Sequence, residues 1–182
     1  LPEQELRVLG NVTGLDVLEF GCGGAQWAIA LKQLGAARVA GMDLSGRQLA
    51  HARNARGTTA VSLVQASAEQ TPFRDASFDL VFCDHGAMSF AQPEFSVAEA
   101  ARVLRGGGRF VFNAASPLQY VCWDDALGRV GERLIGNYFD TRAVEDPGQT
   151  SFTRPYGEWI RLFRQNGFTI EQLIEPRPPE NA

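Results

Sequence analysis

The residues best suited to chemistry are a group of glycines and two acids in the first quarter of the chain. Three glycines lie within residues 19–25 (EFGCGGA), directly after a short apolar run, and Glu19 opens this segment. Glycine allows positive φ angles and a close approach of the backbone to a ligand, and a following helix N-terminus favours electron-rich groups. Asp43 lies 24 residues after Glu19, where a carboxylate can accept two hydrogen bonds from a ribose diol. The pattern predicts a site for a nucleoside-containing cofactor.

Two classes of cofactor share this pattern, and the residues favour one of them. A dinucleotide site requires G-x-G-x-x-G/A, but the sixth position counted from Gly21 is Gln26, which hinders close helix–strand packing under a pyrophosphate. A nicotinamide-dependent oxidoreductase is also disfavoured because the chain has no Tyr-x-x-x-Lys pair and only one lysine, Lys32. The two acids suit a cofactor with a cationic or hydroxylated end. A turn that only caps a helix remains the simpler alternative.

Glycine and proline divide the chain into alternating strands and helices. The patterns predict strands over 16–20, 38–42, 61–65, 78–83, 109–113 and 168–174. Helices are predicted over 25–34, from an N-cap at Ser45 to about Ala55, and over 93–104 and 156–165, with a helical pattern around Leu6 and Leu9 and a turn at Gly106–Gly108. This alternation predicts an α/β, Rossmann-like, doubly wound fold: a mostly parallel sheet with helices on both faces and a ligand site at the carboxyl ends of the strands.

Composition bounds the class of protein. The 182 residues are 45% hydrophobic and 21% charged, which predicts one globular domain over 1–182, with no transmembrane run and no signal peptide. Seventeen Lys and Arg against 21 Asp and Glu give a net charge of -4, which argues against nucleic-acid and anionic-membrane partners. Three separated cysteines and two histidines argue against a disulfide framework and a structural zinc site, and favour a reducing, cytoplasmic setting.

Five segments, in order, resemble the motifs of class I S-adenosylmethionine-dependent methyltransferases of the type 11-like group. Residues 17–28 (VLEFGCGGAQWA) resemble the first motif, V-L-E/D-x-G-x-G-x-G, and residues 41–45 (GMDLS) resemble the second-strand motif with its ribose-binding acid. Residues 65–83 resemble the adenine-binding turn and the fourth strand. Residues 99–112 resemble the helix and turn that lead into the fifth strand, and residues 156–168 resemble the late helix before the sixth strand. The ordered set, covering about residues 14–174, is far more specific than any single motif.

The resemblance implies roles for the matching positions. Asp43 would hold the ribose hydroxyls, Leu44 would lie against the adenine, and the Ala68 amide would donate to an adenine ring nitrogen. Ser67 stands where many members have an Asp, and Ala25 stands for the usual third glycine. The predicted cofactor is S-adenosylmethionine, with S-adenosylhomocysteine as product. The predicted cofactor-binding residues are Glu19, Phe20, Gly21, Cys22, Gly23, Gln26, Asp43, Leu44, Gln48, Ser67, Ala68, Glu69, Cys83, Asp84 and His85.

The acceptor side of the reaction is less constrained. His85 is the candidate base, because it follows the fourth strand beside Asp84 and its ordinary pKa of about 6.5 is near neutrality; a local structural role is the equal alternative. Residues 114–154 form a candidate substrate lid, or alternatively an insert whose aromatics pack into the core. Their acidity favours a neutral or cationic acceptor. The predicted substrate-pocket residues are Met88, Tyr120, Trp123, Tyr138 and Tyr156.

The chain departs from the family at its ends. The family's sheet has seven strands, the last antiparallel, whereas this sequence ends in PRPPENA, so we expect that strand to be absent and the domain to lack N- and C-terminal parts. An open sheet edge would then invite a partner, such as a second copy in a homodimer. The function indicated is methyl transfer (EC 2.1.1.-) to a small-molecule acceptor. The alternative is a regulatory domain that binds the cofactor or its product without turnover.

Overall fold

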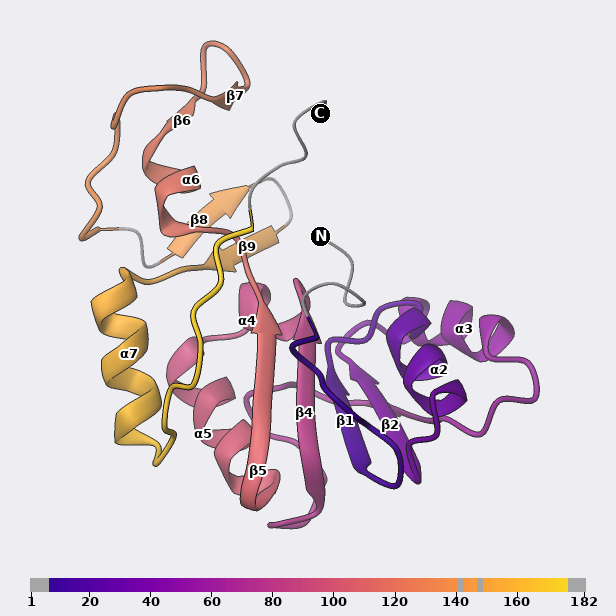
Figure 1. Ribbon diagram of the computed structural model, residues 1–182. Coiled ribbons are helices and arrows are strands. Elements are labelled where there is room, and N and C mark those ends of the chain that lie inside the picture. Colours follow the sequence, from indigo (N-terminus) through magenta and orange to yellow (C-terminus); the bar gives the residue numbers. More distant parts are fainter. Residues whose placement is uncertain (1–6, 141–142, 147–148, 177–182) are drawn as a thin grey trace.

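The computed structural model describes residues 7–140, 143–146 and 149–176, and its centre is one parallel sheet. The five strands are β1 (Asp16–Phe20), β2 (Arg38–Asp43), β3 (Ser62–Gln65), β4 (Phe78–Asp84) and β5 (Leu104–Asn113). They lie in the order β3-β2-β1-β4-β5, and every neighbouring pair is parallel (Figure 1). The predicted α/β fold is therefore confirmed.

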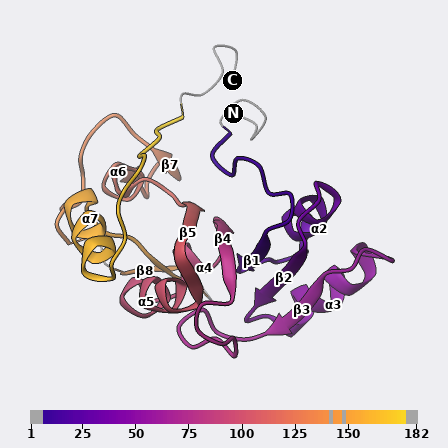
Figure 2. The same cartoon turned by 60° about the horizontal axis from the view of Figure 1, so that its bottom comes forward.

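Helices cover both faces of the sheet, as right-handed crossovers in opposite directions from β1 and β4 require. The helices are α2 (Gln26–Gln33), α3 (Gly46–Ala55), α4 (Ala87–Phe90), α5 (Pro93–Val103) and α7 (Tyr156–Gln165). Figures 1 and 2 show α2 and α3 beside β1 to β3, and α5 and α7 beside β5. Alternate residues of each strand enter separate cores: Val17 packs under α2, whereas Leu18 packs on the face of α4, α5 and α7.

The helix boundaries follow from local chemistry. Ser45 is the predicted N-cap of α3, and its Oγ accepts a hydrogen bond from Gln48 N at 3.3 Å. Pro93 occupies the first turn of α5, where its missing N–H costs nothing. Gly35, with φ 98°, follows the end of α2 in the left-handed conformation that glycine adopts readily.

Three sequence predictions were wrong. Residues 168–174 alternate like a strand, but they form no strand, and Ile170, Leu173 and Ile174 remain exposed. The glycines at 106–108 do not lie outside the strand: β5 begins at Leu104, and its register to β4 shifts across them as a bulge. The described part of the N-terminal pattern, residues 7–10, is not helical, while residues 1–6 lie outside the described residues.

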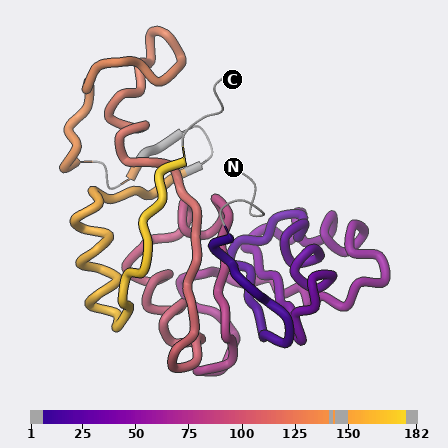
Figure 3. The backbone as a smooth tube through the Cα atoms, viewed as in Figure 1, coloured from indigo at the N-terminus to yellow at the C-terminus, as the bar shows by residue number. Residues whose placement is uncertain are grey.

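The segment after β5 lies beyond the carboxyl end of that strand (Figures 1 and 3). It contains α6 (Pro117–Val121), the short antiparallel pair β6 (Trp123–Asp124) and β7 (Arg129–Val130), and the hairpin β8 (Ala143–Asp146) and β9 (Gln149–Phe152). The second strand of the hairpin packs against α4. A lid function for 114–154 stays a prediction. Among the described residues, no helix combines the length and apolar character needed to cross a membrane.

Candidate functional site

The candidate site lies at the carboxyl ends of β1 and β4, where the strand order reverses. Ligands of such sheets bind at this point because the crossovers leave the two strands in opposite directions. The loops that follow these two strands touch. A Cβ added at Gly21 would collide with the backbone of Gly86 and Ala87, and one added at Gly86 would lie 2.7 Å from the Phe20 carbonyl oxygen. Gly21 also has φ 71°. Glycine is required on both sides of this contact.

Asp43 fixes the glycine loop to the end of β2. Its Oδ2 accepts a hydrogen bond from Gly23 N at 2.8 Å, and its Oδ1 accepts one from Ser45 N at 2.8 Å. The Cys22 amide donates to the Met42 carbonyl at 2.8 Å, which reinforces the same link. An ionised carboxylate has about four acceptor positions, so two remain for a ligand's hydroxyl groups. Asp43 is half-buried, at the rim of the loop.

Glu19 is a buried acid beneath the same loop. Its side chain is only 4% exposed, and its Oε2 accepts a hydrogen bond from Ala28 N, in the first turn of α2, at 2.8 Å. The pKa of Glu19 is raised to about 8, chiefly by burial and in smaller part by the negative charges of Asp84 and Asp43, against the lowering effect of the Ala28 amide. Glu19 is therefore protonated at neutral pH.

Asp84 is held at the end of β4 by two side chains that the sequence analysis missed. The Trp27 indole Nε1 donates to its Oδ2 at 2.9 Å, and Asn113 Nδ2 donates to its Oδ1 at 3.0 Å. The indole also packs edge-on against Phe82, with ring centroids 5.3 Å apart. Asn113 could have been found from the sequence, because it is the first polar residue after the apolar run of β5 and so lies at the carboxyl end of that strand. For Trp27, the only indication in the sequence was its place in the first turn of α2.

His85 adopts a left-handed conformation, with φ 50°, directly after β4. Its backbone N–H donates to the Asn113 carbonyl at 3.0 Å, which turns the chain toward α4. The side chain is exposed and makes no hydrogen bond to another described residue. It is free to meet a substrate, and its role as a base stays a prediction.

The predicted adenine-side residues gather after β2 and β3. Ser67 Oγ accepts a hydrogen bond from Glu69 N at 3.1 Å, and Glu69 Oε1 accepts one from Gln92 N at 2.8 Å. These bonds fix the turn that carries Ala68, which is buried. Leu44 is 72% exposed, so its side chain is accessible to a ligand beside the end of β2. Gln48 is exposed in the first turn of α3, as Gln26 is in α2.

Four of the predicted residues lie in the hydrophobic cores instead: Phe20, Cys22, Cys83 and Met88. The side chains of Phe20 and Cys83 are fully buried, so only their backbone could face a ligand. Burial raises the pKa of both Cys22 and Cys83 to about 12, which keeps these thiols protonated. Met88 is also fully buried, and Ser96 Oγ donates to its sulfur at 3.7 Å. The structure does not bring Met88 together with the other proposed pocket residues.

The remaining predicted pocket residues come from the segment beyond β5. The Tyr156 hydroxyl lies 2.9 Å from Ser116 Oγ and donates to Glu175 Oε1 at 3.4 Å, while the Tyr156 amide donates to the Tyr138 hydroxyl at 3.0 Å. This cluster ties the start of α7 to α6 and to the C-terminal described residues. Tyr120 is half-buried in α6, and Trp123 is exposed, with its indole donating to Asp125 Oδ1 at 3.1 Å.

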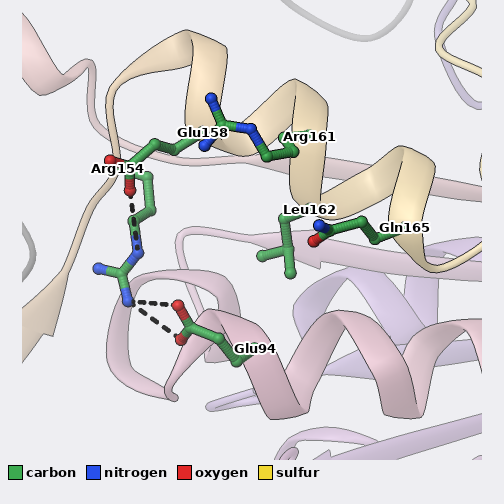
Figure 4. A pocket seen from close by; sticks show the side chains of 6 residues that line it. All are labelled: Glu94, Arg154, Glu158, Arg161, Leu162 and Gln165. Carbon is green, nitrogen blue, oxygen red and sulfur yellow. Dashed lines mark hydrogen bonds and ion pairs between the residues drawn. The ribbon is translucent and has the colours of Figure 1, made fainter.

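A polar pocket of about 160 Å³ lies between α5 and α7 (Figure 4). Arg154, a buried side chain, reaches across it to the Glu94 carboxylate at 2.9 Å and lies 4.0 Å from Glu158. Arg154 thus links the first turn of α5 to the first turn of α7. The described residues contain no group of three or more His, Cys, Asp or Glu side chains arranged to hold a metal ion.

Replacing Glu19 by glutamine is expected to stabilise the protein in a pH-dependent way. The folded pKa of about 8 exceeds the ordinary value of 4.5, so both states hold the proton below about pH 4.5 and the acid has no net effect there. Between about pH 4.5 and 8 the unfolded chain releases the proton first, and the free energy of unfolding falls by roughly 1.4 kcal/mol per pH unit. Glu19→Gln removes this loss while keeping an acceptor for the Ala28 amide.

Denaturant unfolding at about pH 5, 7 and 8 measures this effect. The advantage of Glu19→Gln over the unsubstituted protein should grow with pH to a few kcal/mol, then level off. The exposed Glu171→Gln is the matched control and should leave the curve unchanged. An advantage that is equal at all three pH values would contradict the burial argument.

Comparisons with known proteins identify the family of this chain. The profile of the family described as "Methyltransferase domain" matches residues 18–112. The chain is 33% identical over 187 residues to the demethylmenaquinone methyltransferase of Geobacillus kaustophilus, covering 96% of this chain and 79% of that protein. It is 31% identical over 119 residues to the fatty-acid O-methyltransferase of Mycolicibacterium smegmatis, covering 64% of this chain and 43% of that protein.

The fold agrees as well. The crystal structure of an S-adenosylmethionine-dependent methyltransferase from Mesorhizobium loti superposes with a TM-score of 0.85 at 25% identity, covering 98% of this chain and 85% of that one. The chain spans about half the length of the first curated relatives it matches. The family match falls on β1 through β5, the elements that carry the glycine loop, Asp43 and Asp84. The chain belongs to the methyltransferase domain family, within the class I S-adenosylmethionine-dependent methyltransferases.

Proposed function

We propose that this chain binds S-adenosylmethionine and transfers its methyl group to a small-molecule acceptor, leaving S-adenosylhomocysteine. The observation that carries the proposal is the Asp43 carboxylate, which ties down the glycine loop and keeps acceptor positions for a ribose diol. The residues at this edge match the parts of S-adenosylmethionine. Acidic side chains suit its hydroxyl groups and its positive charge, the exposed Leu44 suits the adenine, and Gly21 and Gly23 allow the backbone to approach the ligand closely.

When bound, S-adenosylmethionine supplies an electrophilic methyl group on a good leaving group, so the protein's main task is to place the acceptor in line. Asp84 lies at the end of β4, fixed by Trp27 and Asn113, and offers an oriented carboxylate to an acceptor hydroxyl or amine. His85, exposed beside it, is the proposed base for an acceptor that must lose a proton.

The acceptor is proposed to be apolar and uncharged over most of its surface. The segment beyond the carboxyl edge exposes seven large apolar side chains: Leu118, Trp123, Leu127, Val130, Leu134, Ile135 and Phe139. Relatives named for fatty-acid and demethylmenaquinone methylation act on molecules of this kind.

A homodimer through the outer edge of β5 is a separate proposal, and sedimentation analysis tests it.

A domain that binds the cofactor without turnover is the second candidate. The observation that favours it is Ser67, whose hydroxyl is occupied by the Glu69 amide at the position where many relatives have an Asp. Such a domain would bind the adenosyl ligands as tightly as an enzyme does but would form no S-adenosylhomocysteine with any acceptor.

Calorimetric titration separates these outcomes. We expect micromolar binding of S-adenosylmethionine and S-adenosylhomocysteine and no binding of NAD. Incubation with long-chain fatty acids and reduced quinones, followed by mass spectrometry for methylated product, then distinguishes an enzyme from a binding domain. NAD binding in place of the adenosyl ligands would overturn the proposal.

A further inference from the structure

Three carboxyl groups converge on one side of the sheet at the proposed cofactor site. Glu19 is in register with Gly41 on one flanking strand and with Phe82 on the other. Asp43 and Asp84 lie two residues beyond these partners, so all three acids project from the face that carries α2. The Ala28 amide of α2 donates to Glu19, and the Trp27 indole of α2 donates to Asp84.

No cation of the described chain balances these acids. The ion pairs among the described residues join other carboxylates, and none includes Glu19, Asp43 or Asp84. The titratable neighbours of Glu19 are the two aspartates and the thiols of Cys22 and Cys83. The thiols stay neutral because burial raises their pKa to about 12. From α2, only the amide of Ala28 and the indole of Trp27 contribute polar contacts.

We propose that binding of S-adenosylmethionine expels the proton of Glu19, so that capture of the cofactor is coupled to ionisation of a carboxyl group sealed beneath the glycine loop. The O–H bond of the carboxyl breaks, its electron pair stays on the carboxylate oxygen, and the proton leaves to solvent. The inference rests on the proposed function and concerns how the same site responds to the charge of its ligand.

The physical reason is electrostatic. Glu19 keeps its proton in the free protein because water is excluded and two like charges are near, consistent with its pKa of about 8. A sulfonium and an ammonium group brought into the site supply the positive charge that the chain itself lacks there, and favour the carboxylate form. S-adenosylhomocysteine has no sulfonium charge and favours ionisation less. Reprotonation of Glu19 after methyl transfer would then weaken the hold on the product.

Calorimetry in several buffers measures the number of protons released when S-adenosylmethionine binds. S-adenosylmethionine is titrated into the protein at about pH 7 in phosphate, HEPES and Tris, and the observed enthalpy is plotted against the ionisation enthalpy of each buffer. We expect release of about one proton per S-adenosylmethionine bound, and a smaller number for S-adenosylhomocysteine. Glu19→Gln should still bind but lose most of the release, whereas Glu171→Gln should match the unsubstituted protein. Because His85 is present in all three proteins, it contributes equally to each.

A second measurement needs no variant. The association constant of the unsubstituted protein should rise by up to about tenfold per pH unit as the pH approaches 8, then level off above the pKa of free Glu19. Binding without proton release, or release that persists in Glu19→Gln, overturns the coupling and leaves the proposed function intact. Failure of the unsubstituted protein to bind S-adenosylmethionine overturns the proposed function and the coupling with it.

Discussion

Replacing Asp43 by alanine is expected to weaken binding of S-adenosylmethionine and S-adenosylhomocysteine by at least ~100-fold. Without the carboxylate, the ribose of the ligand loses two charge-assisted hydrogen bonds, which are together worth about 3 kcal/mol. Each 1.4 kcal/mol changes Kd about tenfold. The change also releases the Gly23 and Ser45 amides from their acceptor. The glycine loop therefore loses its link to β2 at the same time as the ligand loses its partner.

Calorimetric titration measures the loss, and thermal unfolding separates it from general damage. Asp43→Asn is the matched variant, because it preserves shape and one acceptor oxygen but not the charge. We expect its Kd to fall between those of the unsubstituted protein and Asp43→Ala. If Asp43→Ala binds within about threefold of the unsubstituted protein, the ribose assignment is wrong.

The second large effect is expected for Gly21→Ala. A methyl group there meets the backbone of Gly86 and Ala87, which cannot move aside as a flexible side chain would, and residue 21 has a positive φ. Overpacking costs about 1–3 kcal/mol and the left-handed conformation about 1–2 kcal/mol. We expect the free energy of unfolding to fall by about 2–5 kcal/mol, and cofactor binding to be lost as the two loops separate.

Gly23→Ala is the control within the same loop. Gly23 also has a positive φ, of 50°, but an added Cβ would meet nothing within 4 Å. It should cost only the conformational part, about 1–2 kcal/mol. Denaturant unfolding of the two variants isolates the contact between the β1 and β4 loops. Equal losses in the two variants would show that this contact is not tight.

Much of this protein could be predicted from local sequence. Runs of five or six residues rich in apolar side chains predicted β1 through β5, and three of them end directly before Gly21, Asp43 or Asp84. These signals are readable because the residues that favour extended backbone and those that end it are neighbours in the chain. The rule that ligands meet the carboxyl ends of parallel strands then pointed to Glu19, Asp43 and Asp84. The cap at Ser45 was readable for the same reason, since its partner Gln48 is three residues away.

Predictions failed where the outcome depended on a distant partner. Residues 168–174 have an alternating pattern, but a strand needs a neighbour to accept and donate its hydrogen bonds. Here Phe168 instead packs against Phe110 and Phe163, with ring centroids 5.8 and 6.1 Å away, and the residues after it pair with no strand. Met88 was predicted to line the substrate pocket, but α4 packs against α5 and buries its side chain.

The sequence by itself determined the five strands of the sheet, the helices α2, α3, α5 and α7, the glycine loop and the identity of the acids, because these depend on residues that are neighbours in the chain. Only the tertiary structure decided how deeply those acids are buried and which groups contact them. Glu19 is buried because α2 covers it, Asp84 is oriented because Trp27 and Asn113 arrive from α2 and β5, and Gly21 must be glycine because β4 turns into α4 beside it. Burial and contact between segments tens of residues apart depend on strand order and register, which no local pattern contains.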